Sequence, residues 1–152
     1  MSPGHVQAIA ERTPLSLGTH SYAVGREKIR EYARAVGETN PLHLDVDAAR
    51  GAGHPDLVAP PMFAAVYCGG AFESALLEPE LGIDFEMLLH SAQEFEWGPL
   101  VVAGDEITTE ISLAEVSERL GMRFYAFHSS SRNQRGELVC RGVWTIVVRR
   151  RE

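Results

Sequence analysis

A run of uncharged residues behind a pair of prolines most constrains the fold of this chain. Pro60 and Pro61 precede residues 62–72, which read Met-Phe-Ala-Ala-Val-Tyr-Cys-Gly-Gly-Ala-Phe and carry no charge. Proline is favoured in the first turn of a helix, because the N–H that it lacks would have no partner there. A helix that is apolar nearly all round is normally buried. The sequence therefore predicts a central helix that begins near Pro61 and is covered by the rest of the chain.

The C-terminal half changes to the two-residue period that is typical of strands. Apolar and polar residues alternate over residues 94–97 and 107–113, and residues 122–129 and 138–148 are rich in aromatic and β-branched side chains. Turn-forming residues separate these four segments. A short further strand is expected at residues 20–24. Helices followed by a run of strands indicate an α+β fold with an antiparallel sheet.

The N-terminal half is predicted to be irregular at first and then helical. Residues 1–18 contain two prolines and two glycines with little periodicity, so we expect an irregular arm with a short helical turn around residues 6–12. Apolar residues at helical spacing predict an amphipathic helix over residues 26–36, closed by Gly37. A short helical piece is expected at residues 46–50. No linker divides the chain, which predicts a single domain over residues 1–152.

Charge and composition exclude several classes of function. The 152 residues include 14 Lys and Arg and 21 Asp and Glu, so the formal net charge is −7. Binding to nucleic acid depends on basic patches, and the one basic run, Arg149 to Arg151, is interpreted as a solvated tail. The longest uncharged run, residues 57–72, is shorter than the roughly 20 residues that span a bilayer. We expect no nucleic-acid partner and no membrane partner.

The cysteines and the N-terminus indicate a cytoplasmic protein without metal. Cys68 and Cys140 stand in apolar surroundings without the spacing of metal ligands, and we interpret both as small buried residues in a reducing compartment. No charged segment followed by an apolar one marks a secretion signal. His54, His90 and His128 have no carboxylate or cysteine at ligand spacing, so no metal site is expected.

The loop over residues 37–45 carries a candidate acid/base pair. It reads Gly-Glu-Thr-Asn-Pro-Leu-His-Leu-Asp, with Glu38 and His43 five positions apart. A helix would place these two side chains on different faces, whereas the turn marked by Asn40 and Pro41 can aim both at one point. Such a pair can serve as general acid and base. The alternative is that the loop is only structural, with Glu38 solvated after a helix end. Asp45 is interpreted as the cap of the next helix.

The same loop resembles the hydratase motif of the MaoC-like (R)-specific enoyl-thioester hydratases and dehydratases, which usually reads Gly-Asp-x-Asn-Pro-x-His-x-Asp. Residues 25–33, 58–63 and 102–105 are similar to the N-terminal-type branch of that family. That branch includes subunits of heterodimeric (3R)-hydroxyacyl-carrier-protein dehydratases. The resemblance covers most of the chain. It implies a hot-dog fold, in which about five antiparallel strands wrap a central helix.

The resemblance also implies an activity. Members of the family act on (3R)-hydroxyacyl or trans-2-enoyl thioesters of CoA or acyl carrier protein and need no cofactor. Glu38 and His43 would hold the β-hydroxyl or water and move the α-proton, with Asn40 and Pro41 positioning the loop. A backbone N–H near Pro61 and Met62 would polarise the thioester carbonyl. Phe63 and Tyr67, with Met62, would line an acyl tunnel or else belong to the core. The family forms dimers whose sheets join edge to edge.

Two departures from the family pattern bear on activity. Glu38 replaces the usual Asp, and a displacement of about 1 Å can cost about 100-fold in rate. Pro61 replaces the glycine of the catalytic Ile-Ala-His-Gly-Met segment and has no N–H to donate. The first hypothesis is a dehydratase or hydratase, as a homodimer or heterodimer. The alternative is a non-catalytic acyl-binding subunit whose MaoC-type partner carries the chemistry. A thioesterase is disfavoured, because hot-dog thioesterases usually lack this Asn-Pro-x-His loop.

Overall fold

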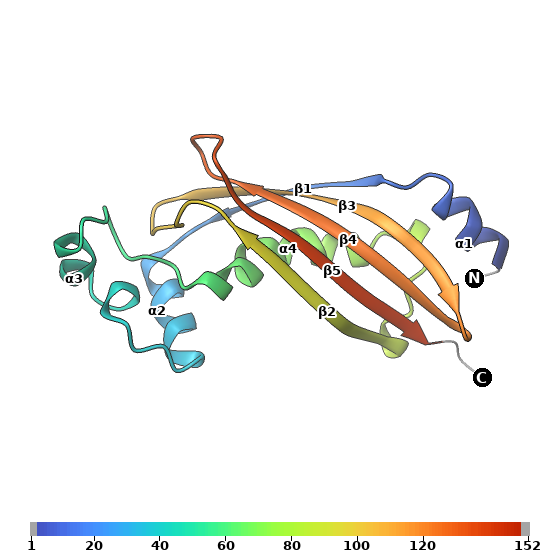
Figure 1. Cartoon of the computed structure of the whole chain (residues 1–152), viewed down its shortest axis with the longest axis horizontal. Coiled ribbons are helices and arrows are strands. Elements are labelled where there is room, and N and C mark those ends of the chain that lie inside the picture. Colours follow the sequence, from blue (N-terminus) through green and yellow to red (C-terminus); the bar gives the residue numbers. More distant parts are fainter. Residues whose placement is uncertain (1–2, 150–152) are drawn as a thin grey trace.

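The computed structural model describes residues 3–149 and contains one sheet and one long central helix (Figure 1). The helices and strands in chain order are α1 (Pro3–Ala10), β1 (Leu15–Ala23), α2 (Arg26–Ala35), α3 (Val46–Gly51), α4 (Ala64–Leu76), β2 (Leu88–Trp97), β3 (Glu106–Arg119), β4 (Met122–Arg132) and β5 (Leu138–Arg149). Short 3₁₀ helices occupy Pro41–His43, Pro61–Phe63, Pro79–Leu81 and Phe85–Met87. No helix in this part of the chain is long and apolar enough to cross a membrane.

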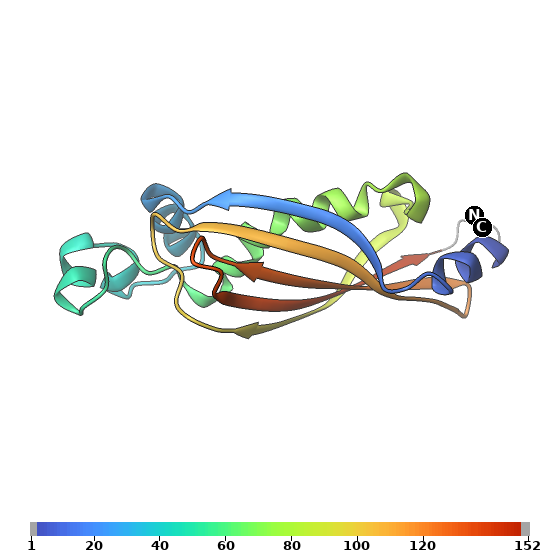
Figure 2. The same ribbon diagram turned by 90° about the horizontal axis from the view of Figure 1, so that it is seen from above.

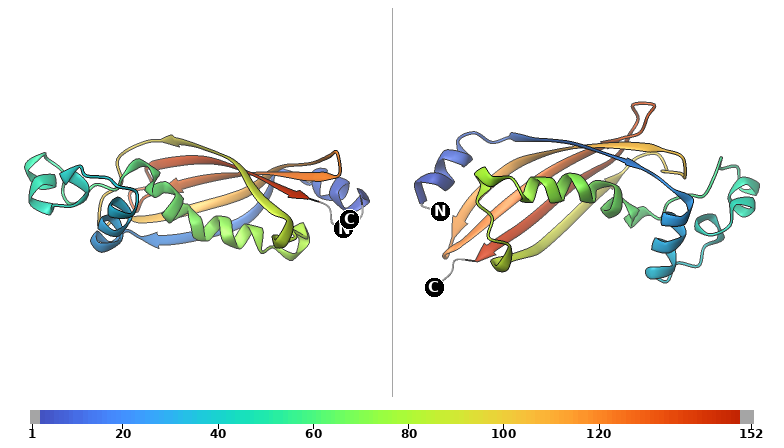
Figure 3. Two further views of the ribbon diagram at one scale, coloured as in Figure 1. Left: turned by 90° about the horizontal axis from the view of Figure 1, so that it is seen from below. Right: turned by 180° about the vertical axis from the view of Figure 1, so that it is seen from behind.

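The five strands form one antiparallel sheet in the order β1-β3-β4-β5-β2. The sheet is strongly twisted, and α4 lies along its concave face (Figures 2 and 3). β1 and β2 form the two edges. This arrangement is the hot-dog fold, and the predicted antiparallel sheet around a buried helix is confirmed.

The core lies between α4 and the inner face of the sheet. α4 buries Tyr67, Cys68, Ala71 and Ala75, all at most 2% exposed. The facing side of the sheet contributes fully buried side chains from its three central strands: Ile107, Leu113, Tyr125, Phe127 and Ile146. Complete burial of one such large apolar side chain contributes about 1.5–3 kcal/mol. The helix is therefore held by packing and not by its own propensity, which two central glycines reduce.

The helical turn expected around residues 6–12 overlaps α1, but the irregular arm expected over residues 1–18 is wrong for most of the other described residues, and Met1 and Ser2 lie outside the described part. Val6 and Ile9, one helical turn apart on α1, are 6% and 2% exposed and join the core. β1 begins at Leu15, five residues before the predicted strand. Gly18, at φ 103°, lies where the register between β1 and β3 shifts. The glycine that suggested irregular structure thus belongs to a bulge within a strand.

Residues 26–58 form a helical lobe beyond the end of the sheet, beside the start of α4 (Figure 1). The predicted helix over residues 26–36 is confirmed as α2, and Gly37 follows it at φ 74°. The predicted cap is also confirmed, because an Asp45 carboxylate oxygen accepts hydrogen bonds from the amides of Asp47 and Ala48 at 2.8 and 3.4 Å. These elements place the loop over residues 37–45 near the first turn of the central helix.

Candidate active site

His43 is held in one tautomer by a buried hydrogen bond. Asn40 Oδ1 accepts from the Leu42 amide at 3.0 Å and opens the 3₁₀ helix Pro41–His43, which turns the imidazole inward to 7% exposure. His43 Nδ1 lies 2.6 Å from the carbonyl oxygen of Val58. A carbonyl only accepts, so Nδ1 carries a proton, and in the neutral form of the ring Nε2 is the acceptor. Nε2 makes no hydrogen bond to the residues that the structure describes.

Glu38 is an ionised carboxylate folded onto its own loop. Its Oε1 accepts hydrogen bonds from the amides of Thr39 and Asn40, both at 2.9 Å. The Asn40 amide, then the Thr39 amide and the charge of His43, lower the pKa of Glu38 against a smaller opposing effect of burial. Within residues 3–149, Glu38 and His43 share no direct hydrogen bond, although they lie close enough to interact electrostatically. One carboxylate and one imidazole acceptor therefore stand on the same loop.

Residues 57–59 connect this loop with the start of the central helix. The Val58 amide donates to Leu42 O at 3.0 Å, while Val58 O receives the proton of His43. The Ala59 amide donates to Val101 O at 2.8 Å, so the segment is also tied to the connection between β2 and β3. The loop and the helix start are consequently fixed relative to each other.

The start of the central helix presents one free amide. Pro61 has no N–H, and the Phe63 amide donates to Pro60 O at 2.9 Å. The Met62 amide has no hydrogen-bond acceptor among the described residues. Free amides in the first turn of a helix attract negative charge, because the helix dipole adds to their own. The Met62 N–H is thus a free hydrogen-bond donor at the start of the helix.

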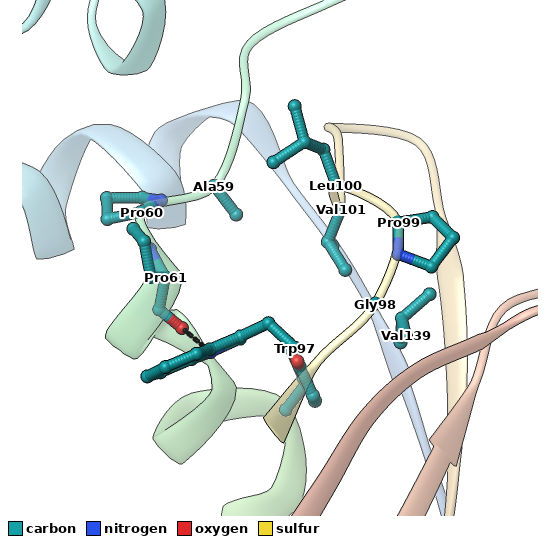
Figure 4. Close-up of a pocket in the computed structure, with 10 residues that line it drawn as sticks. Ala59, Pro60, Pro61, Trp97, Gly98, Pro99, Leu100, Val101 and Val139 are labelled. Atoms are coloured by element: carbon teal, nitrogen blue, oxygen red, sulfur yellow. Dashed lines mark hydrogen bonds between the residues drawn. The ribbon is translucent and has the colours of Figure 1, made fainter. Parts of the chain in front are cut away.

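An apolar pocket of about 60 Å³ adjoins Pro61 (Figure 4). Residues 59–61 form one wall and residues 97–101 the other, with Tyr67 and Val139 also lining it. Burial raises the pKa of the Tyr67 phenol, and Cys140 lies within hydrogen-bonding reach of it. Tyr67 therefore stays neutral and contributes its ring and a hydroxyl to the pocket.

The structure separates the residues that were predicted as one substrate-binding group. Pro61 and Tyr67 line the pocket, and the Met62 side chain is 47% exposed. Phe63 is 0% exposed and packs edge-on against Tyr22 and Tyr32, with ring centroids 6.2 and 5.5 Å away. Of the two expectations for Phe63, its packing matches the core.

Two contributors to the site escaped the sequence-based prediction. One is the carbonyl of Val58, which fixes His43, and the other is Trp97, whose indole N–H donates to Pro61 O at 2.8 Å (Figure 4). The signal for Trp97 was present: a large aromatic residue stands at a strand end, directly before Gly98 and Pro99. Within residues 3–149, no three His, Cys, Asp or Glu side chains lie together in a way that could hold a metal ion.

The hot-dog fold of this chain is that of solved dehydratases, and its loop with Glu38 and His43 lies near the start of the central helix. The profile described as "FAS1-like, dehydratase domain region" matches residues 13–141. The chain belongs to this family.

Two relatives carry the name UPF0336, and two solved structures with the same fold are dehydratases. A UPF0336 protein of Clavibacter michiganensis is 44% identical over 128 residues, 84% of this chain and 86% of that protein. A UPF0336 protein of Saccharopolyspora erythraea is 38% identical, over 86% of this chain and 84% of that one. The HadBC (3R-hydroxyacyl-ACP dehydratase) complex of Mycobacterium tuberculosis matches with a TM-score of 0.72 and 27% identity, over 88% of this chain and 96% of that one. A MaoC-like dehydratase matches at 0.74 and 27%, over 91% of this chain and 43% of that one.

Proposed function

We propose that the protein interconverts (3R)-hydroxyacyl and trans-2-enoyl thioesters by removing or adding water. The observation that carries this proposal is the Nδ1–H of His43 donated to Val58 O. In the neutral imidazole that bond puts the proton on Nδ1, so that Nε2 is the nitrogen that can accept a proton. Gln93 Oε1, and not His43 Nε2, is the buried side-chain polar atom without a partner among the described residues, so Nε2 lies open to solvent and to a substrate.

In the proposed reaction, His43 moves the proton of one elimination and the ionised Glu38 holds the leaving hydroxyl. In dehydration, His43 Nε2 accepts the α-proton, and the Cα–H electron pair forms the Cα–Cβ double bond as the Cβ–O bond breaks. His43 passes the same proton to the departing β-hydroxyl, which leaves as water, and the imidazole is neutral again. Glu38 holds the hydroxyl through its second carboxylate oxygen, since Oε1 is occupied by the Thr39 and Asn40 amides. General acid–base catalysis of this kind contributes about 10²–10⁴ in rate. Hydration runs the same steps in reverse.

The thioester carbonyl is proposed to bind at the N–H of Met62. The negative charge that develops on this oxygen during proton transfer is stabilised by the free amide and by the helix start. Pro61 removes one donor from this end of the helix, so Met62 acts without help from the preceding residue. The chemistry requires no cofactor.

The substrate carrier is proposed to be CoA or acyl carrier protein, and the molecule is proposed to act as a homodimer or heterodimer. β2 lies at one edge of the sheet, with one side of its backbone free for pairing in a second hot-dog subunit. The two cysteines are free and buried, which fits a reducing compartment, and we place the activity in the cytoplasm.

The proposed function is tested by following hydration of enoyl-CoA thioesters of several chain lengths with the purified protein. His43→Ala should lower turnover by about 10²–10⁴-fold. His128→Ala is the matched control, because His128 is an exposed histidine on β4 and lies away from the loop. It should leave the rate unchanged. Absence of hydration by the wild-type protein at every chain length, or full activity of His43→Ala, would overturn the proposal.

A second candidate function is an acyl-binding subunit without chemistry of its own. Pro61 favours it, because it replaces a helix-start amide by a residue that cannot donate, and the HadBC complex provides a two-subunit precedent at 27% identity. Under this reading, mass measurement of the protein purified from its native host shows a heterodimer. The activity of that complex would then be insensitive to His43→Ala.

A further inference from the structure

The carbonyl group of Pro61 accepts two hydrogen bonds from different parts of the chain. One comes from the Ala64 amide, as the helix geometry dictates. The other comes from the indole Nε1–H of Trp97, 2.8 Å away and 36 residues later in the sequence (Figure 4). The second bond is not required by the helix. It points from the edge strand of the sheet to the first peptide unit of the helix start.

That peptide unit contains the proposed oxyanion donor. The C=O of Pro61 and the N–H of Met62 belong to one planar trans peptide, so a force that fixes the carbonyl also fixes the direction of the N–H. Hydrogen bonds that share a peptide group also polarise one another, and a carbonyl with two donors makes its amide a stronger donor. Since Pro61 supplies no N–H, the orientation of this one peptide unit matters more here than in a chain with glycine at that position.

The backbone of Trp97 is fixed by strand pairing. It is paired with Cys140 at the end of β2, and the next residue, Gly98, donates its amide to Val139 O at 2.9 Å. A Cβ on Gly98 would lie 2.3 Å from Leu138 O, so the close approach of the two chains depends on this glycine. The indole is nevertheless 50% exposed. Burial alone therefore does not account for its position, whereas the bond to Pro61 does.

We propose that Trp97 is a positioning residue that holds the Pro61–Met62 peptide so that the Met62 N–H faces the thioester oxygen. The inference rests on the proposed function, and it concerns the orientation of one peptide and not proton transfer. Trp97 acts on the transition state through Met62 and does not touch the reacting atoms. Its loss should therefore lower kcat and leave KM nearly unchanged.

The test compares Trp97→Phe, which keeps an aromatic ring and removes the N–H, with Leu100→Ala. Leu100 is the matched control, because it is a 56% exposed residue of the same pocket and makes no bond to Pro61. Trp97→Phe should lower kcat about tenfold, less than the 10²–10³ lost with a direct oxyanion donor. In ¹H–¹⁵N spectra, the Met62 amide should move upfield in Trp97→Phe and by much less in Leu100→Ala.

The outcomes separate this inference from the proposed function. An active wild type with an unchanged kcat and an unmoved Met62 resonance in Trp97→Phe would overturn the role of Trp97 and leave the function standing. Equal losses in Trp97→Phe and Leu100→Ala would also overturn it, since they would reflect the pocket and not the bond. A wild-type protein without hydratase activity would overturn the proposed function. In that case, the shift of the Met62 amide resonance in Trp97→Phe would still decide whether Trp97 orients the Pro61–Met62 peptide.

Discussion

The imidazole of His20 lies directly over the α-carbon of Gly70. A Cβ built on Gly70 would come within 2.3 Å of His20 Nε2 and 2.5 Å of Cδ2. The contact joins β1 to the middle of α4, at a point where a glycine weakens the helix. The neighbouring Gly69 has nothing within 4 Å of such a Cβ. Two adjacent glycines in one helix thus differ in whether a side chain has room.

Gly70→Ala should show a stability effect that depends on His20. Alanine favours the helix by about 1 kcal/mol over glycine, but at position 70 this gain is offset by displacing the exposed imidazole. In a His20→Ala background the same substitution should stabilise by about 1 kcal/mol, as Gly69→Ala should in either background. Urea denaturation of the four proteins in the cycle measures the coupling. Equal effects of Gly70→Ala in both backgrounds would show that the ring moves at no cost.

Glu38 should titrate below the ordinary range of a glutamate. The Asn40 and Thr39 amides that it accepts lower its pKa, so the carboxylate remains ionised as the pH falls past 4.5, the value of an unperturbed side chain. The amide proton resonances of Thr39 and Asn40 should shift together as Glu38 is protonated at a pH below 4.5. Glu38→Gln should abolish this shift. The same variant should lose about 10²–10⁴ in hydratase rate while its thermal unfolding changes little. A titration near or above 4.5 would contradict the arrangement.

Asp56 should make stability fall in acid. Arg26 donates to both oxygens of Asp56, at 2.8 and 2.6 Å, and this pair lowers the pKa of Asp56 from 3.8 to about 2. A depressed pKa in the folded protein contributes stability that is complete above the unfolded value and is lost as the pH falls from about 4 to about 2. Free energies of unfolding measured across that window should fall less steeply in Asp56→Asn. Arg26→Met should flatten the same window, and an unchanged slope in both variants would exclude this pair as its origin.

Leu120→Asn should stabilise the protein. Leu120 and Gly121 form the two-residue turn between β3 and β4, with φ angles of 53° and 71°, and Leu120 is 96% exposed. Asn-Gly is preferred in such turns, and a left-handed conformation costs an ordinary residue about 1–2 kcal/mol. The midpoint of thermal unfolding should therefore rise. Leu77→Asn is the control, because Leu77 is 59% exposed at an ordinary φ of −82°, and it should bring no gain.

The elements that the sequence predicted well are those whose periodicity arises within one segment. α2 shows its apolar stripe without reference to any neighbour, and the uncharged run after Pro61 can only be a buried helix. α1 was predicted only in part, as a short turn around residues 6–12, because Val6 and Ile9 are its only two buried apolar residues and the groove that covers them is made elsewhere in the chain. The start of β1 was missed because the sequence does not distinguish a glycine in a strand bulge, such as Gly18, from a glycine in a loop.

The same division applies to the candidate site. The turn at Asn40 and Pro41 and the cap at Asp45 follow from neighbouring residues, so they were predictable. The Val58 carbonyl that selects the His43 tautomer lies 15 residues away, and the Trp97 indole lies 36 residues from Pro61. Such contacts depend on how the sheet brings distant segments together. No local pattern encodes them.

The position of Val58 bears on the order in which contacts form when the chain folds. The segment around it bonds to Leu42 on one side and pairs with Val102 on the other, so it closes two loops of different length. Contacts of long sequence separation form late, because the chain must first lose the entropy of loop closure. The tautomer of His43 is therefore fixed only when Val58 has paired with Val102 at the end of the sheet. A nascent or partly refolded chain would carry the whole motif in its sequence and still lack a fixed tautomer of His43.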